Sequence, residues 1–330
     1  MTSLAEFWTP IYNAFNPMEP VPQGKMASWF VQRPDSPLKA MMARLAPQRL
    51  TQRVLLVGHR SSGKSSELAR LGSELAARYN YLVIRIDLEQ NLEIDRVNPV
   101  EVLFLMGAAV YKVAQASLKN KPDQARFDAL VDGLNTLVRT QTENRQFSLD
   151  VADLLNNLIV FGATALIGPA AAGAASLIKP FSFVSGADYK VVSKLEVEPQ
   201  IKETLAHLNA IIDDVEAKAG RPLVIIVDGL DKVSLKLAEH LFVTSTRFLA
   251  GPGCRVIYTA PIYLYYAPRF STVRGYFNLV GFPNVNLHTR DRQVDVSSSG
   301  YQTMRQAVHK RLQDWANGRT RPSPGRRSTC

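Results

Sequence analysis

Residues 53–66 read RVLLVGHRSSGKSS, a short apolar run that leads directly into the spacing G-x-x-x-x-G-K-[ST]. The run at 53–58 predicts a buried β-strand, and the amphipathic stretch at 65–80 predicts a helix. Between them, glycines let backbone N–H groups curve around a phosphate, and the helix N-terminus adds positive potential. The stretch therefore predicts a strand, a phosphate-binding loop and a helix, in that order.

The expected phosphate-binding loop assigns particular roles to two of its side chains. Lys64 is expected to reach the β- and γ-phosphates of a nucleoside triphosphate, and the Ser65 hydroxyl is expected to ligate Mg²⁺. The expected contacts with the cofactor are Gly58, His59, Arg60, Ser61, Ser62, Gly63, Lys64, Ser65 and Ser66. The alternative interpretation is a glycine-rich turn with an exposed lysine.

A second motif, VIIVDGLD at 224–231, ends an apolar run with a carboxylate. Asp228 at the carboxyl end of a buried strand stands where a water-mediated Mg²⁺ ligand is expected. Asp231 is expected to orient or deprotonate an attacking water, and its alternative role is that of a helix N-cap. Thr259 lies at the carboxyl end of a further apolar run, RVIYTA at 255–260, and its plain interpretation is a threonine packed within a strand.

Together, GHRSSGKSS at 58–66 and LVIIVDGLD at 223–231 resemble the ASCE branch of P-loop ATPases, which includes AAA+ and STAND proteins. In many AAA+ proteins a glutamate follows the metal-binding aspartate, whereas here Gly229 follows and the acid falls at Asp231. This form is more similar to STAND and KAP-type ATPases and to origin-recognition-like AAA+ proteins. The resemblance covers residues 28–283 and implies that ATP and Mg²⁺ are bound and that Lys64, Asp231 and Thr259 act in ATP hydrolysis. In the families it resembles, a polar residue at the place of Thr259 senses the γ-phosphate.

Apolar runs alternate with helical patterns along the chain, which predicts an α/β fold with a parallel β-sheet flanked by helices. The expected strands are 53–58, 81–87, 222–228, 255–260 and 276–281, and the expected helices are 36–46, 65–80, 99–118, 123–140, 196–219, about 234–250 and 300–316. The predicted domains are an N-terminal arm and linker at 1–35, an ATPase domain at 36–285 with a helical hydrophobic insertion at 141–195, and a short helical extension with a disordered basic tail at 286–330.

The segment 154–178 is free of charge and long enough to cross a membrane once. It lies between Lys64 and Asp228, which are expected to meet at one nucleotide, so a single crossing would separate them. A buried helical hairpin, a re-entrant membrane loop and a surface for self-association remain open. KAP-type ATPases carry membrane segments between these same motifs, so the resemblance keeps peripheral membrane association among the alternatives.

Three further sequence features suggest functional roles, and each also has an ordinary structural interpretation. Arg247, Arg269 and Arg274 are candidates to act across a subunit interface, and each is otherwise a surface charge. The linker at 28–33 often touches adenine in related ATPases, which makes Phe30 or Val31 a candidate for stacking; core packing is the alternative. The sequence NKPD at 120–123 spells a guanine-reading motif but follows a helical stretch, so it predicts a turn.

Composition narrows the class of protein. With 46% hydrophobic residues among 330, complete disorder is excluded, and two cysteines exclude both a disulfide scaffold and a cysteine-based zinc site. The N-terminus shows no secretory pattern, so we expect a cytoplasmic protein. Of the net charge of +10, half lies in residues 291–330, where eight Lys and Arg residues face three Asp. A basic tail of this kind contacts nucleic acid or anionic lipid, or is simply solvated.

These observations predict an ATP-driven molecular switch of STAND or AAA+ type. By resemblance, it would form a homo-oligomer and signal to a separate effector protein, in bacterial defence or signalling. The alternatives are a nucleic-acid-associated ATPase that uses the basic tail, a membrane-associated KAP-like ATPase, and a small-molecule kinase.

Overall fold

The computed structural model describes residues 4–16, 19–46, 52–92, 94–141, 160–162, 194–288 and 291–320. The chain divides into two units. The sheet unit comprises Pro37–Arg60 and Leu71–Phe282, and the terminal unit comprises Met1–Ser36, Ser61–Arg70 and Pro283–Cys330. The division falls inside helix α4 (Lys64–Tyr79), so its first turns belong to the terminal unit and the remainder to the sheet unit.

The sheet unit is built on a sheet with the strand order β3-β2-β4-β5-β1-β6. Five strands are parallel, which confirms the predicted parallel sheet: β1 (Arg53–Gly58), β2 (Leu82–Asp87), β4 (Leu223–Asp228), β5 (Arg255–Pro261) and β6 (Asn278–Phe282). The sixth, β3 (Val160–Gly162), pairs antiparallel with β2. These three residues, within the insertion expected to be helical, are therefore a strand; the rest of 154–178 lies outside the described residues.

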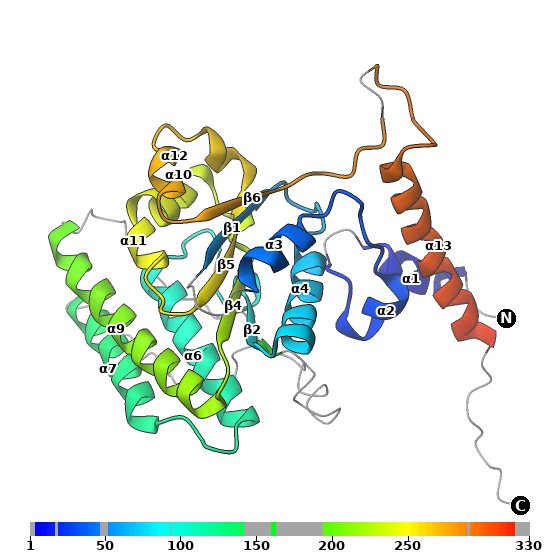
Figure 1. The fold of residues 1–330 in the computed structure, drawn as a ribbon. Helices are drawn as coiled ribbons and strands as arrows, with labels where there is room; N and C mark the ends of the chain where they lie inside the picture. Colours follow the sequence, from blue (N-terminus) through cyan, green and yellow to red (C-terminus); the bar gives the residue numbers. More distant parts are fainter. Residues whose placement is uncertain are drawn as a thin grey trace, which may run out of the picture. The chain divides into compact units, whose positions relative to one another are not determined.

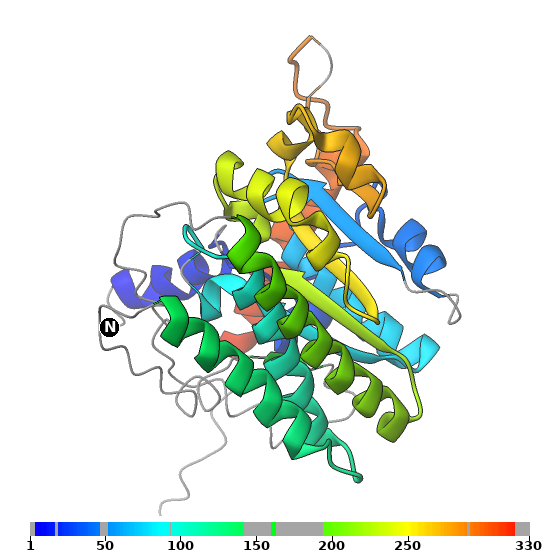
Figure 2. The ribbon, with the colours of Figure 1, turned by 90° about the vertical axis from the view of Figure 1, so that its left-hand side faces the viewer.

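Alternate strand residues face opposite layers of helices. Ile225 and Val227 of β4 and Leu55 of β1 belong to the core formed with α6 (Pro99–Ser117) and α9 (Lys194–Ala219), against which α7 (Gln124–Gln141) packs. Figure 2 looks onto this layer, and Figure 1 shows α3 (Leu38–Leu45) and α4 on the other side of the sheet.

Gly72 of α4 identifies the strand residues of that second face. A Cβ at Gly72 would lie 3.2 Å from Val83 Cγ1 and 3.5 Å from Ile226 Cδ1, so the helix backbone approaches the sheet there. Because side chains alternate along a strand, Asp228 projects to the same face as Ile226.

Helix α6 is the most apolar helix of the sheet unit. Within the described residues it is the one helix long and apolar enough to span a membrane, and 78% of that stretch is buried in the protein. Its N-terminus carries a capping box in which Asn98 and Glu101 exchange hydrogen bonds of 2.9 and 3.0 Å. Burial against α9 and the sheet accounts for its composition.

The helix expected at about 234–250 is divided into three pieces. They are α10 (Leu235–Glu239), a π-helical turn (His240–Thr244) and α11 (Thr246–Leu249). The Thr246 hydroxyl donates to backbone carbonyls of the preceding turn, Val243 O at 3.0 Å among them. This competition with backbone bonding explains the break. The sheet unit also contains four short elements: α5 (Leu88–Asn91), 3₁₀ turns at Leu230–Lys232 and Ile262–Tyr266, and α12 (Phe270–Arg274).

The terminal unit contains α1 (Leu4–Ala14), a 3₁₀ turn at Gln23–Lys25, α2 (Met26–Trp29) and α13 (Ser299–Thr320). Helix α1 occupies 11 residues of the N-terminal arm that the sequence predicts at 1–35. Asp314 of α13 accepts hydrogen bonds from Trp29 Nε1 at 2.9 Å and Lys25 Nζ at 2.8 Å. Side-chain bonds over this sequence separation join the two ends of the chain. Of the helical extension and disordered basic tail predicted at 286–330, residues 321–330 lie outside the described residues.

Candidate functional site

The carboxyl edge of the sheet is the place where an open parallel sheet binds ligands. Neighbouring strands β1 and β5 lead the chain in opposite directions there: β1 continues to β2 across β5 and β4, whereas β5 continues to β6 across β1. This reversal is a topological switch point. Gly58 ends β1 at this edge, in register with Pro261 of β5, and Leu56 is in register with Thr259.

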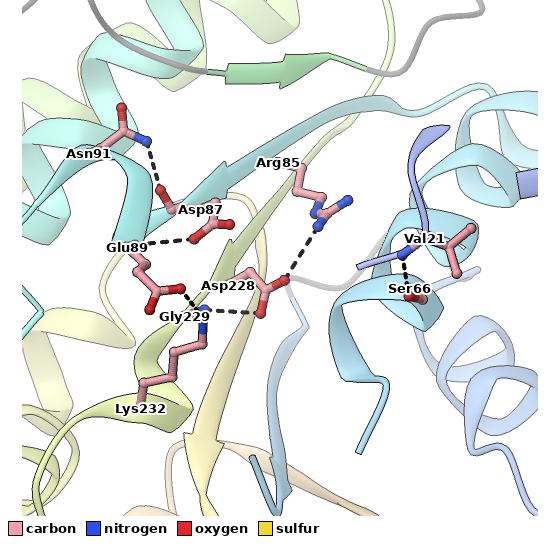
Figure 3. Close-up of polar contacts among 9 residues, drawn as sticks. All are labelled: Val21, Ser66, Arg85, Asp87, Glu89, Asn91, Asp228, Gly229 and Lys232. Carbon is pink, nitrogen blue, oxygen red and sulfur yellow. Dashed lines mark hydrogen bonds and ion pairs between the residues drawn. The ribbon is translucent and has the colours of Figure 1, made fainter. Parts of the chain in front are cut away.

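Asp228 is the last residue of β4, and its side chain is only 2% exposed. Its Oδ1 accepts a hydrogen bond from the Gly229 N–H at 2.9 Å, and its Oδ2 lies 3.5 Å from Nη2 of Arg85 on β2 (Figure 3). The carboxylate is thus buried and held by one N–H and one guanidinium. Two oxygens in this position offer the hard ligand atoms that Mg²⁺ prefers.

Gly229 explains why a second acid does not follow Asp228 directly. Its φ is +98°, a left-handed conformation that side chains disfavour. A Cβ there would also lie 3.3 Å from the backbone nitrogen of Glu89 and 3.4 Å from Oδ1 of Asp87. A glutamate at this position would be strained, so an acid is accommodated only further along the chain, as at Asp231.

Asp231 lies in the 3₁₀ turn Leu230–Lys232 and is buried. The alternative prediction, that Asp231 is the N-cap of the following helix, was wrong. Ser234 caps α10, and its hydroxyl accepts a hydrogen bond from Leu237 N at 3.4 Å. Burial, and secondarily the Asp231 carboxylate, raises the pKa of Tyr263, whose hydroxyl donates to the Val233 carbonyl. Asp231 is therefore an acidic group close to the Asp228 strand end and outside a capping role for α10.

Thr259 projects to the same face of the sheet as Asp228, since its neighbours Tyr258 and Ala260 face the α6 and α9 core. It is fully buried, and its Oγ1 has no hydrogen-bond partner among the described residues. A buried hydroxyl without a partner costs free energy and is rare in folded proteins. The Thr259 hydroxyl could therefore bind a polar ligand at this edge of the sheet. This favours a ligand-binding role over the alternative in which the threonine only packs within the strand.

Four charged residues beside Asp228 were absent from the sequence-based expectations: Arg85, Asp87, Glu89 and Lys232. Asp87 ends β2 in register with Asp228. Burial, together with the charge of Asp228, raises the pKa of Asp87 to about 6. The signal for Asp87 was available, because YLVIRID ends in an acid as PLVIIVD does.

Glu89 connects three loops at this edge. It pairs with Lys232 of the 3₁₀ turn after β4 (Figure 3), and its Oε1 lies 3.8 Å from Arg60 Nη2 in the loop after β1. Its N–H donates to Asp87 Oδ1 at 3.1 Å, and Asn91 Nδ2 donates to the Asp87 carbonyl at 2.7 Å. These contacts hold the end of β2 in place.

The remainder of the expected phosphate-binding loop, Ser61–Ser66, belongs to the terminal unit. Ser61 and Gly63 have φ values of +59° and +94°, so the loop includes two left-handed residues. Lys64 is the first residue of α4, is buried, and donates to Ser62 Oγ at 3.3 Å. The Ser66 hydroxyl accepts from Val21 N–H at 3.0 Å (Figure 3).

Arg33 is a further residue of this loop's surroundings that the sequence did not indicate. Its buried guanidinium donates to the carbonyls of Ser62 at 3.1 Å and Pro283 at 2.6 Å and pairs with Asp35 at 3.0 Å. One side chain thereby ties the loop to the linker before α3 and to the segment after β6.

The weaker candidates have contacts of their own. Arg247 stacks on Phe248 at 4.8 Å, and Arg274 lies over the rings of Tyr265 and Phe270. In the linker, Phe30 lies under Arg70 at 5.0 Å. The turn predicted at NKPD is confirmed between α6 and α7, where Oδ1 of Asp123 accepts from Ala125 N at 3.0 Å.

No protein-family model matches this chain, and a comparison with curated proteins finds no match either. Among the described residues, no group of three or more His, Cys, Asp and Glu side chains is arranged to hold a metal ion. A nucleotide-bound Mg²⁺ takes most of its ligands from phosphates and water, and one or two protein oxygens suffice for it. Asp228 fits that limited requirement.

Proposed function

We propose that this chain binds ATP with Mg²⁺ and hydrolyses it, as a molecular switch of STAND or AAA+ type. One observation carries the proposal: the spacing G-x-x-x-x-G-K-S directly follows β1, and the next two strands of the sheet, β5 and β4, carry polar groups toward their carboxyl ends. These groups are the Thr259 hydroxyl, which has no hydrogen-bond partner among the described residues, and the buried Asp228 carboxylate. Strand, loop and helix occur in the order that phosphate binding requires.

The proposed roles follow from the chemistry of each side chain. Lys64 and the loop N–H groups would bind the β- and γ-phosphates, and Ser65 and, through water, Asp228 would hold Mg²⁺. Bound Mg²⁺ would neutralise charge on the phosphates. Asp231 would accept a hydrogen bond from the water that attacks the γ-phosphorus and so aim it. The Thr259 hydroxyl would donate to a γ-phosphate oxygen and thereby gain a partner.

The terminal unit supports the switch part of the proposal. Val21 and Arg33 bond to Ser66 and Ser62 of the loop, and Trp29, between them in sequence, bonds to Asp314 of α13. A change in the loop on nucleotide binding therefore acts directly on the segment that holds α13. We propose that this unit transmits the nucleotide state to a second copy of the chain or to a separate effector protein.

The test is equilibrium binding of a fluorescent ATP analogue, combined with measurement of phosphate release. Lys64→Ala should lower nucleotide affinity at least about 10-fold, the loss expected for one charged contact. Asp228→Asn should lower affinity mainly in the presence of Mg²⁺. Lys236→Ala removes an exposed lysine of α10 and is the matched control.

Equal affinity in Lys64→Ala and the control would contradict nucleotide binding at this loop. Size-exclusion chromatography with light scattering, in ADP and in a non-hydrolysable ATP analogue, tests oligomerisation separately. Transfer of phosphate to an added small molecule instead of water would favour a kinase.

A further inference from the structure

Arg85 is an unusual residue for an interior strand. It lies on β2 between the buried residues Ile84 and Ile86, and its side chain is only 13% exposed. Side chains alternate along β2, so Arg85 shares the face of Val83, which packs on Gly72, and not the face of Ile84, which belongs to the α6 and α9 core. That face is also the face of Asp228. Figure 3 shows the guanidinium directed at the Asp228 carboxylate.

The charge of Asp228 needs compensation in this structure. A carboxylate with 2% exposure is costly without a counter-charge, and Asp87 beside it in register adds a second acid. The Gly229 N–H satisfies Oδ1, which leaves Oδ2 to Arg85. Arg85 is thus a cation in contact with Oδ2, the Asp228 oxygen that the Gly229 N–H leaves open to Mg²⁺.

The contact between Arg85 and Asp228 is longer than that of a strong guanidinium–carboxylate pair. A strong guanidinium–carboxylate pair has two parallel hydrogen bonds with N···O distances of about 2.7–2.9 Å. Here a single Nη2···Oδ2 contact of 3.5 Å is formed. Arg33 and Asp35 in the same chain show the alternative, with two bonds of 3.1 and 3.0 Å. Arg85 therefore neutralises Asp228 without locking it.

From this we infer that Arg85 is a positioning residue that occupies the metal-facing oxygen of Asp228 in the nucleotide-free protein and is displaced when Mg²⁺ with ATP binds. This inference rests on the proposed function. Two cations compete for one carboxylate, so Arg85 raises the Mg²⁺ concentration that the site requires. After displacement the guanidinium remains near Asp87, on which its charge already acts.

The test replaces Arg85 with neutral residues of similar length, Arg85→Met and Arg85→Gln. The same two substitutions at Arg255 are the matched control, because Arg255 is buried on β5 and stacks on Tyr81 at the opposite end of the sheet. Two quantities are measured at constant ionic strength: the Mg²⁺ concentration for half-maximal binding of a fluorescent ATP analogue, and the rise in melting temperature on adding MgCl₂ without nucleotide.

Both Arg85 variants are expected to need about 5- to 10-fold less Mg²⁺ than the wild type, a shift of about 1–1.4 kcal/mol. MgCl₂ should also raise the melting temperature of the Arg85 variants more than that of the wild type. The Arg255 variants should need the same Mg²⁺ concentration as the wild type. An unchanged or higher Mg²⁺ requirement in Arg85→Gln, which retains a hydrogen-bond donor for Asp228, would overturn the inference even if Arg85→Met does not fold. Failure of the wild type to bind the analogue at saturating Mg²⁺ would instead reject the proposed function, and this inference with it.

Discussion

Replacement of Gly229 by alanine tests whether the backbone after Asp228 is as constrained as its geometry indicates. The left-handed conformation at φ +98° costs a residue with a Cβ about 1–2 kcal/mol. The new Cβ would also meet the Glu89 nitrogen at 3.3 Å and the Leu88 nitrogen at 3.5 Å. These are backbone atoms of the short helix α5, so they yield less readily than a side chain, and we add about 1 kcal/mol for this contact.

Alanine also restricts the unfolded chain, which offsets about 0.4–1 kcal/mol of the cost. The net loss expected for Gly229→Ala is therefore about 1–3 kcal/mol. Gly220→Ala is the matched control, because Gly220 has φ +62° and no atom within 4 Å of a Cβ. Without the contact term, Gly220→Ala should cost only about 0–1.6 kcal/mol.

The assay is urea unfolding followed by far-ultraviolet circular dichroism, with the free energy of unfolding extrapolated to water. If Gly229→Ala is as stable as Gly220→Ala, the close approach of the β2 and β4 loops plays no part in stability. Backbone conformation and contact with α5 would then not be the reason that glycine follows Asp228.

Three other substitutions test a charge, a buried hydroxyl and the terminal unit. In buffer without divalent cations, the free energy of unfolding should fall as pH rises from about 4 to about 6, because Asp87 has a pKa of about 6 when folded against 3.8 when unfolded and so binds its proton more tightly in the folded state. Asp87→Asn should remove this fall, which amounts to about 3 kcal/mol at most, and an unchanged profile by urea unfolding would contradict the assignment. Tyr258→Phe should cost about 1–2 kcal/mol by deleting a 2.9 Å hydrogen bond to a backbone carbonyl of α11, whereas Tyr266→Phe, at an 84% exposed position, should be neutral. Asp314→Ala removes the acceptor of the Trp29 Nε1 hydrogen bond and should lower the free energy of unfolding, followed by tryptophan fluorescence, by about 1 kcal/mol. An unchanged free energy of unfolding would show that this hydrogen bond does not contribute to stability.

Tryptophan fluorescence suits the last of these measurements because the three tryptophans of the chain, Trp8, Trp29 and Trp315, all lie in the terminal unit. Circular dichroism reports helices and strands of both units. Comparison of the two signals in one titration therefore shows whether the units unfold together. Two separate transitions would require the free energies above to be assigned unit by unit.

Local patterns determined the elements of this protein and the chemistry of its motifs. The apolar run before Gly58, the helical spacing after Lys64 and the acid at Asp228 each depend on neighbours in the chain, and the sequence alone places them on strand, helix and strand end. The break in the helix after His240 and the helix α1 escaped the sequence pattern. At the helix break, the Thr246 hydroxyl competes with backbone hydrogen bonding. Helix α1 contains Pro10, a residue that disfavours the interior of a helix.

Tertiary structure alone decided which motifs share an edge. The contact of Arg85 with Asp228 joins residues 143 positions apart, and it exists because β2 lies beside β4 in the register that aligns Asp87 with Asp228. Likewise, Arg33 meets Ser62 only because the linker before α3 runs beside the loop. A sequence pattern reports which face of an element is apolar. Strand order and register follow from how those faces pack together, so no local stretch of sequence determines which charged residues pair at the site.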